Sequence, residues 1–213
     1  MRALAVAAVL LLVAAGCGGG DGEGGAGDVV CEEVEAPEPR EPRQHEPPEG
    51  TLEPSATWTL VFDTSCGTFT VELDLTLAPE TSASLVALAR EGYFDDTVFH
   101  RVVPDFVIQG GDPTQSGSGS PGYATLDRPP LSVRYTKGIV AMAKTEIAPA
   151  GTAGSQFFMV TAEDAGLDPV YAVVGRVSDG LEVVEKIGEL GDRETQQPTQ
   201  TVLVRTVTVD ESS

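Results

Sequence analysis

The side chains best suited to chemistry lie in two short apolar runs near the middle of the chain. Residues 98–103 alternate in a way that is typical of a β-strand, and Arg101 shares its predicted face with Phe99. Residues 106–109 form a second strand-like run, in which Gln109 is the polar residue. A charged donor and an amide set into an apolar wall predict a binding groove.

The sequence does not contain the residues that several other kinds of active site require. Residues 117–122 match the pattern G-x-G-x-x-G, but Pro121 interrupts it and no helical pattern follows, so we interpret the segment as a flexible loop rather than a dinucleotide site. The only histidines are His45, in a proline-rich segment, and His100, on the predicted strand face opposite Arg101. These two histidines do not provide the residues for a hydrolytic triad or a zinc site, and we expect no metal and no cofactor. We expect His100 to be hydrogen-bonded inside the folded domain.

The elements that must position these residues are mostly strands. Alternating or continuous apolar runs predict strands at 57–63, 69–73, 98–103, 106–109, 138–143, 156–161, 170–177 and 201–209. Helical spacing predicts one helix at 82–91, which Gly92 would end, and another at 181–187, which Gly188 would end. Many strands, two helices and no alternation of the two favour a mostly β fold, in which a closed antiparallel barrel leaves no exposed sheet edge.

Length and charge limit the kind of protein. The chain has 213 residues, 41 % of them hydrophobic, which is enough for one domain with a substantial core. Its formal net charge of −20 argues against nucleic acid as a partner. We interpret the acidity as a source of solubility and mutual repulsion, with a specific cationic partner as the alternative.

The first residues are typical of an exported protein. Arg2 precedes the apolar stretch 4–15, which is too short to span a bilayer, so residues 1–16 are predicted to be a signal peptide. Cys17 follows small residues, as in a bacterial lipoprotein, and we expect it to carry lipid that anchors the protein to the outer face of the bacterial cytoplasmic membrane. The alternative is plain secretion with Cys17 unmodified.

The rest of the chain divides into a linker, one domain and a short tail. Residues 17–55 are rich first in glycine and then in acidic residues and proline, which predicts a flexible linker without a core of its own. The folded domain is expected at 56–210 and the tail at 211–213.

The cysteines suggest how the linker is attached. Disulfides form in exported proteins, and if Cys17 is lipidated, Cys31 and Cys66 are left as a pair. Their bridge would staple the linker to the domain. The alternative is two free thiols.

Two segments together resemble the signature of the cyclophilin family of peptidyl-prolyl cis-trans isomerases. They are FDDTVFHRVVPDFVIQGG at 94–111 and GSQFF at 154–158, and the resemblance extends over roughly 57–210. It implies an eight-stranded antiparallel β-barrel capped by two α-helices, in a monomer that catalyses rotation about X-Pro bonds. Its partners would be proline-containing polypeptides outside the cytoplasmic membrane, whose folding it would assist.

The resemblance also implies roles for individual residues. Arg101 would donate a hydrogen bond to the prolyl nitrogen as that atom loses its amide conjugation, and Gln109 would bind a substrate carbonyl. The backbone at Ala143 and Lys144 would hold the peptide in an extended form. The residues expected to bind the substrate or line its proline pocket are Phe106, Val107, Ala143, Lys144, Gln156, Phe158, Leu167 and Tyr171.

Three positions depart from the family pattern. Gly166 stands where many cyclophilins have tryptophan, Tyr171 where histidine is usual, and Val107 where methionine is common. Tyrosine still offers a ring and a donor, and valine is apolar, so neither change should abolish turnover. The altered rim motivates an alternative, a cyclophilin-shaped module that binds proline peptides with little turnover. The presence of both Arg101 and Gln109 favours the enzyme.

Overall fold

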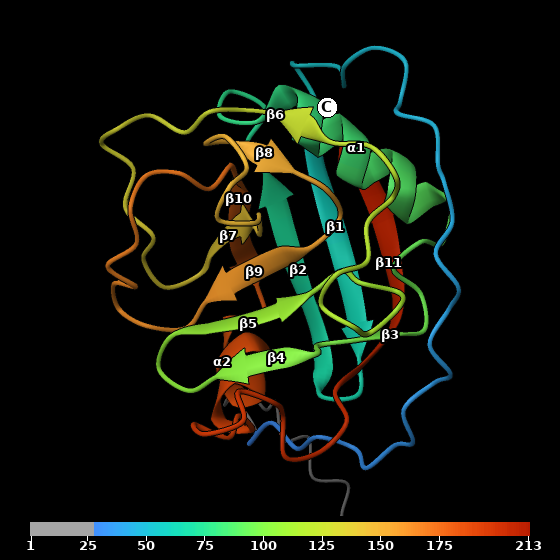
Figure 1. Cartoon of the computed structure of the whole chain (residues 1–213), viewed down its shortest axis with the longest axis vertical. Coiled ribbons are helices and arrows are strands. Elements are labelled where there is room, and N and C mark those ends of the chain that lie inside the picture. The colour runs from blue at the N-terminus through green and yellow to red at the C-terminus, as the bar shows by residue number, and fades with distance from the viewer. Residues whose placement is uncertain (1–27) are drawn as a thin grey trace, which may run out of the picture.

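The computed structural model describes residues 28–213, which form eleven strands and two helices (Figure 1). The predicted signal peptide and the predicted lipid site at Cys17 lie outside the described residues. The strands are β1 (Thr57–Thr64), β2 (Gly67–Leu73), β3 (Thr97–Val98), β4 (Arg101–Val103), β5 (Val107–Gly110), β6 (Thr125–Leu126), β7 (Ile139–Met142), β8 (Thr152–Ala153), β9 (Phe157–Val160), β10 (Val173–Asp179) and β11 (Leu203–Ser212). The helices are α1 (Pro79–Arg90) and α2 (Leu181–Glu189). Within residues 28–213, neither helix is long and apolar enough to cross a membrane.

Nine of the strands form one curled antiparallel sheet in the order β3-β11-β1-β2-β10-β7-β9-β5-β4, and β6 pairs separately with β8. The two edge strands, β3 and β4, are joined in the chain through only Phe99 and His100, so the curled sheet brings its two ends near each other although they are not paired. The prediction of a mostly β, antiparallel fold with two helices is confirmed. The main sheet has nine strands rather than eight, because the predicted strand 98–103 is two strands: β3 pairs with β11, and β4 pairs with β5. The short strands β6 and β8 were not predicted.

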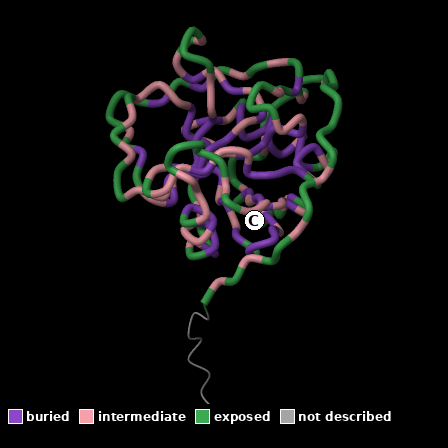
Figure 2. The backbone as a smooth tube through the Cα atoms, turned by 60° about the horizontal axis from the view of Figure 1, so that its bottom comes forward, coloured by how far each residue is buried: buried purple, intermediate pink, exposed green. Residues whose placement is uncertain are grey.

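The core fills the inside of the curled sheet, where the buried part of the chain is concentrated (Figure 2). Its centre is aromatic: Phe62 stacks on Phe69 with ring centroids 4.8 Å apart, and Phe157 meets Phe62 edge to face at 5.5 Å. Both helices bury one face against this core, α1 through Leu85 and Leu88, among others, and α2 through residues that include Ile187. The helices therefore cap the sheet, as the family resemblance implied.

Several element ends differ from the sequence prediction. Helix α1 begins at Pro79, whose fixed φ suits the first turn. Helix α2 runs to Glu189, so Gly188 lies inside it and does not end it. A Cβ at Gly188 would come within 3.0 Å of the Thr161 side chain, so this glycine permits close packing of the helix. Strand β11 extends to Ser212, which pairs with β1, so most of the predicted tail belongs to the sheet.

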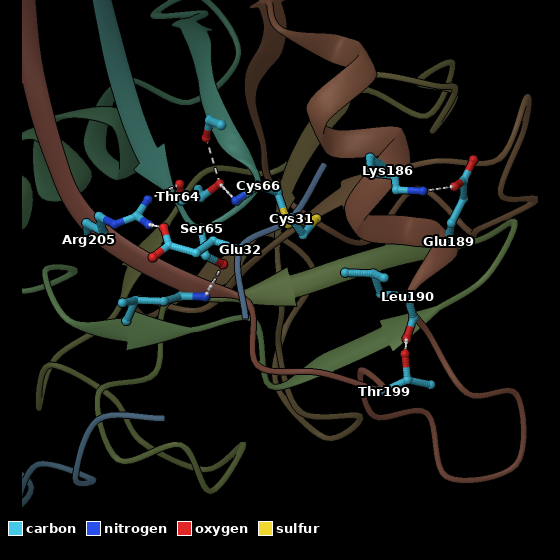
Figure 3. The surroundings of a disulfide bond; sticks show 12 residues. Cys31, Glu32, Thr64, Ser65, Cys66, Lys186, Glu189, Leu190, Thr199 and Arg205 are labelled. Atoms are coloured by element: carbon cyan, nitrogen blue, oxygen red, sulfur yellow. Dashed lines mark hydrogen bonds and ion pairs between the residues drawn. A yellow bond between two sulfur atoms is a disulfide. The ribbon is translucent and has the colours of Figure 1, made fainter. Parts of the chain in front are cut away.

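Residues 28–55, which we call the strap, have no helix or strand but lie along the domain (Figure 1). At the start of the strap, Cys31 forms a disulfide with Cys66, in the turn between β1 and β2 (Figure 3). Next to it, the backbone N–H of Glu32 donates to the carbonyl of Ser65 at 2.7 Å, and the Glu32 carboxylate pairs with Arg205 at 2.5 Å. The strap is thus covalently and electrostatically fixed at this end.

The middle of the strap is held by one arginine. The guanidinium of Arg40 donates to three backbone carbonyls in the turn after α1, those of Gly92, Tyr93 and Asp95. The backbone N–H of Arg40 donates to the carbonyl of Pro113 at 2.9 Å. A single residue therefore ties the strap to two loops of the domain.

Further contacts follow toward the end of the strap. The His45 ring lies 2.8 Å from the Glu91 carboxylate. The backbone N–H of His45 donates to the carbonyl of Pro121. The indole N–H of Trp58 donates to the carbonyl of Glu53 at 3.1 Å. The strap is irregular but docked, which differs from the expectation of a flexible linker for residues 28–55.

Candidate active site

Strand register places three of the predicted site residues in one row. Arg101 of β4 lies directly opposite Gln109 of β5, and Gln109 lies directly opposite Phe158 of β9. Directly paired residues on neighbouring antiparallel strands present their side chains on the same face, about 5 Å apart. The row therefore places the charged donor, the amide and the aromatic ring side by side.

Hydrogen bonds connect the polar members of the site. A terminal guanidinium nitrogen of Arg101 (Nη1) donates to Oε1 of Gln109 at 3.4 Å, and Nε2 of Gln109 donates to Oε1 of Gln156 at 3.0 Å. Nε2 of Gln156 then donates to the carbonyl of Gly119 at 3.0 Å. Burial lowers the pKa of the Arg101 guanidinium from its usual value, yet arginine remains protonated in proteins. The site thus combines the fixed positive charge of Arg101 with two amide side chains, Gln109 and Gln156, that are hydrogen-bonded in series.

The apolar site residues gather in a second cluster, separate from the main core. Strand β9 is buried on both faces: Phe157 and Met159 face the main core, whereas Phe158 and Val160 belong to the second cluster. The predicted pocket residues found in this second cluster are Phe106, Val107, Ala143, Phe158, Leu167 and Tyr171. Val107 is 2 % exposed and forms the base of this wall, whereas Phe106, Leu167 and Tyr171 are half-buried at its surface.

A cavity of about 390 Å³ adjoins this wall. Its lining includes Gln109, Ala143, Lys144 and Gln156, together with the glycine- and serine-rich segment 117–120. The backbone N–H of Ala143 already donates to the carbonyl of Gln156 at 2.9 Å. The Lys144 ammonium donates to two backbone carbonyls of its own loop. The structure therefore brings Gln109, Lys144 and Gln156 together around one cavity, whereas Arg101 lies outside its lining and is linked to it through the hydrogen bond to Gln109.

Two of the family departures lie at the rim of this wall. Gly166 has φ +63° and open space where a side chain would project, so glycine suits the backbone there and a larger residue would meet strain rather than a clash. The Tyr171 ring packs edge to face on Phe158, with centroids 5.4 Å apart, and the backbone N–H of Tyr171 donates to the hydroxyl of Tyr135. Tyr135, which the sequence analysis did not single out, therefore supports the rim.

Two sequence interpretations near Arg101 are wrong. Phe99 and Val102 are both fully buried in the main core, while Arg101 is half-buried at the groove. The reason is that the chain leaves the strand conformation between β3 and β4, so side chains before and after this break do not alternate as they would in one continuous strand. Arg101 and Phe99 therefore do not share a face. Neither ring nitrogen of His100 has a hydrogen-bond partner among the described residues, so the expectation of a hydrogen-bonded histidine also fails. Burial lowers the pKa of His100, which favours the neutral ring.

The sequence analysis also missed the carboxylate that shapes the loop beside the cavity. Asp112 is fully buried and accepts hydrogen bonds from the backbone N–H groups of Thr114 and Gly119, at 2.8 and 3.1 Å. Burial alone would raise the pKa of Asp112, but the hydrogen bonds, led by that of Thr114, outweigh it and hold the pKa below the usual value. The Asp-x-Thr spacing, typical of a turn closed by an aspartate, was the available signal.

Across residues 28–213, no group of three or more histidine, cysteine, aspartate or glutamate side chains is arranged to hold a metal ion.

Comparison with known proteins identifies the family signature over almost the whole domain. Residues 59–209 match the family model described as cyclophilin type peptidyl-prolyl cis-trans isomerase/CLD. The peptidyl-prolyl cis-trans isomerase CYP18-2 of Arabidopsis thaliana is 38 % identical over 169 residues, covering 77 % of this chain and 95 % of the relative. A peptidyl-prolyl cis-trans isomerase-like 1 of Aspergillus fumigatus is 36 % identical over 157 residues, covering 71 % of this chain and 96 % of the relative.

A solved structure shares the same fold. A cyclophilin type peptidyl-prolyl cis-trans isomerase of Cryptosporidium parvum, crystallised in the presence of the dipeptide Ala-Pro, matches with a TM-score of 0.65 and 28 % identity. The match covers 71 % of this chain and 98 % of that protein.

Proposed function

Because the chain belongs to the cyclophilin-type family of peptidyl-prolyl cis-trans isomerases, we propose that it catalyses X-Pro bond rotation in exported proteins and assists their folding outside the cytoplasmic membrane. The observation that carries the catalytic part is the row of Arg101, Gln109 and Phe158 across three strands. The observation that supports an exported protein is the disulfide between Cys31 and Cys66, because such bonds persist in oxidising compartments.

The chemistry needs a fixed donor rather than a nucleophile. Rotation about an X-Pro bond is slow because amide resonance resists it. When the bond twists, the prolyl nitrogen loses conjugation and gains a lone pair that can accept a hydrogen bond. The protonated Arg101 would supply this bond from a position that Gln109 helps to fix, so the interaction strengthens in the transition state.

The neighbouring groups would orient the substrate. The wall that contains Phe158 and is rimmed by Phe106 and Tyr171 would hold the proline ring, and Gln109 would bind a substrate carbonyl. The cavity beside Ala143 and Gln156 would receive the preceding residues of an extended peptide. No bond to the enzyme forms or breaks, which is consistent with a site built from one arginine, amides and apolar side chains.

The membrane anchor is part of the same proposal. A lipid on Cys17 would place the domain at the outer face of the bacterial cytoplasmic membrane, where proline-containing proteins emerge during export. The oxidising environment implied by the Cys31–Cys66 disulfide is compatible with that location. Mass spectrometry of the mature protein tests the anchor: we expect a lipid-modified Cys17 at the N-terminus, whereas an unmodified terminus would leave only secretion.

A proline-peptide assay tests the activity directly. In an assay coupled to a protease that cleaves only the trans form, the purified protein should accelerate the cis-to-trans phase in proportion to its concentration. Saturable binding of the same peptide without acceleration would instead identify the binding module with little turnover. Absence of both binding and acceleration would overturn the proposed function.

A further inference from the structure

A residue outside the strands that carry the row also contacts Arg101. Nε of Arg101 donates to the side-chain Oε1 of Gln196 at 2.9 Å, which is shorter than the 3.4 Å bond from Nη1 to Gln109. The two acceptors bind different nitrogens of one planar guanidinium. Among the described residues, the remaining nitrogen, Nη2, makes no hydrogen bond, so it is left available to a substrate atom.

The loop before β11 holds Gln196 rigidly at this place. The backbone N–H of Gln196 donates to the carbonyl of Asp192 at 2.8 Å, and its carbonyl accepts from the N–H of Val102 at 2.9 Å. The Asp192 carboxylate accepts from the backbone N–H groups of Glu194 and Thr195. Both the turn and the edge of β4 therefore fix the residue beside Arg101.

Backbone geometry does not explain why a glutamine occupies this position. Gln196 has φ +58°, in the left-handed region where glycine is the residue without strain. The residue is also exposed, so its side chain is not needed to fill the core. The side-chain hydrogen bond to Arg101 is the contact that a glycine could not make.

We propose that Gln196 is a positioning residue, which acts through Arg101 and does not touch the substrate. An arginine has a long, flexible stem, and Gln109 alone fixes only one end of its guanidinium. The second acceptor at Nε fixes the rotation of the plane and thereby aims Nη2 into the groove. Since precise placement matters most in the transition state, loss of Gln196 acts on kcat more than on KM.

The test compares three variants of the full mature protein. Its kinetic measurements rest on the proposed isomerase function, whereas its spectroscopic measurement does not. Gln196→Gly removes the side chain and relieves the backbone, Gln196→Ala removes the side chain alone, and Gln197→Ala is the matched control. Gln197 is the exposed neighbour in the same loop, and its side chain makes no hydrogen bond within residues 28–213.

The expected kinetic result separates positioning from folding. Gln196→Gly should unfold at the same temperature as the wild type or a higher one, yet its kcat should fall on the order of tenfold with KM nearly unchanged. Gln196→Ala should lose a similar factor, and Gln197→Ala should retain wild-type kinetics. Unchanged kcat in a folded Gln196→Gly protein, or an equal loss in Gln197→Ala, would overturn the proposal.

A spectroscopic measurement tests the same contact without requiring activity. The Nε–H proton of Arg101 should give a slowly exchanging NMR signal in the wild type and in Gln197→Ala, and a faster exchanging one in Gln196→Gly. Equal exchange rates in all three proteins would contradict the positioning role. If the wild-type protein proved inactive toward proline peptides, the proposed function would fail while this measurement would still decide whether Gln196 holds Arg101.

Discussion

The strap is held differently from the surface that carries Arg101, Gln109 and Phe158, which we call the catalytic face after the function proposed for it. On the catalytic face, consecutive strand pairings set the positions of Arg101, Gln109 and Phe158, so each side chain depends on the register of the whole sheet. The strap has no such pairing and is held at separate points, chiefly the Cys31–Cys66 disulfide and the hydrogen bonds of Arg40.

This difference has a mechanical consequence. A sheet register fails cooperatively, because a shift by one residue moves every side chain to the other face. The separate contacts that hold the strap can break one at a time, so parts of the strap can detach while the domain stays folded. Changes on the face should therefore alter both stability and turnover, whereas changes in the strap should alter local protection and leave turnover nearly intact.

The largest expected effect is on the face. Phe158 is 6 % exposed and packs against Tyr135 and Tyr171, so Phe158→Ala should reduce the free energy of unfolding by about 3 kcal/mol or more. The same change should weaken peptide binding, because it empties the wall of the proposed proline pocket. Urea unfolding and KM measure the two effects. Phe158→Leu is the control that retains most of the apolar volume. If Phe158→Ala left both quantities at wild-type values, Phe158 would not be part of the wall that couples stability to binding.

The next effect concerns the strap. The cysteines are 35 residues apart, and closing a loop of this size stabilises a fold by on the order of 3 to 4 kcal/mol at most in the chain-entropy model. The double variant Cys31→Ser, Cys66→Ala should lose part of this and become sensitive to trypsin at Arg40 and Arg43, with kcat/KM within about twofold of the wild type.

The oxidised and reduced wild-type proteins provide the matched comparison for this prediction, because they share one sequence. Reduction should reproduce the trypsin sensitivity. A loss of turnover as large as that of a face variant would show that the two regions are not separable.

A smaller, pH-dependent effect is expected at the loop between the two regions. Asp112 has a lower pKa in the folded protein than its usual value of 3.8, so its ionised form stabilises the fold. This contribution is complete above about pH 4 and is lost as the pH falls through the lower folded-state pKa. Asp112→Asn should therefore cost about 1 to 3 kcal/mol at neutral pH, and the difference from the wild type should shrink below about pH 4.

Denaturant titrations at several pH values measure this difference. Asp168→Asn, at an exposed aspartate outside the loop, is the control and should show neither effect. A deficit of Asp112→Asn that stayed constant down to pH 2 would contradict the ionised-carboxylate explanation.

The same contrast explains what could be predicted from the sequence. Strand alternation singled out Arg101 and Gln109, whereas Phe158 came from the family resemblance. The apolar run of β9 was evident because both of its faces are buried. The break at Phe99 and His100 was not visible, since nothing in six alternating residues marks a change of pairing partner. Docking of the strap was also not predictable, because it depends on backbone carbonyls exposed by a distant turn, such as that of Tyr93.

Tertiary contacts also override local composition in two smaller cases. Gly188 was read as a helix stop, but its role is to let α2 approach Thr161 closely. Gln196 carried no sequence signal, because its importance arises only when the loop before β11 is brought beside β4.

The most direct test compares two arginines, one from each region. Arg101→Ala and Arg40→Ala remove the same side chain, from the catalytic face and from the strap. With thermal unfolding recorded for both, the protease-coupled proline assay should show at least a tenfold loss of kcat/KM in Arg101→Ala, equivalent to about 1.4 kcal/mol of transition-state free energy, and a value close to wild type in Arg40→Ala. A folded Arg101→Ala protein with wild-type kcat/KM would contradict the account.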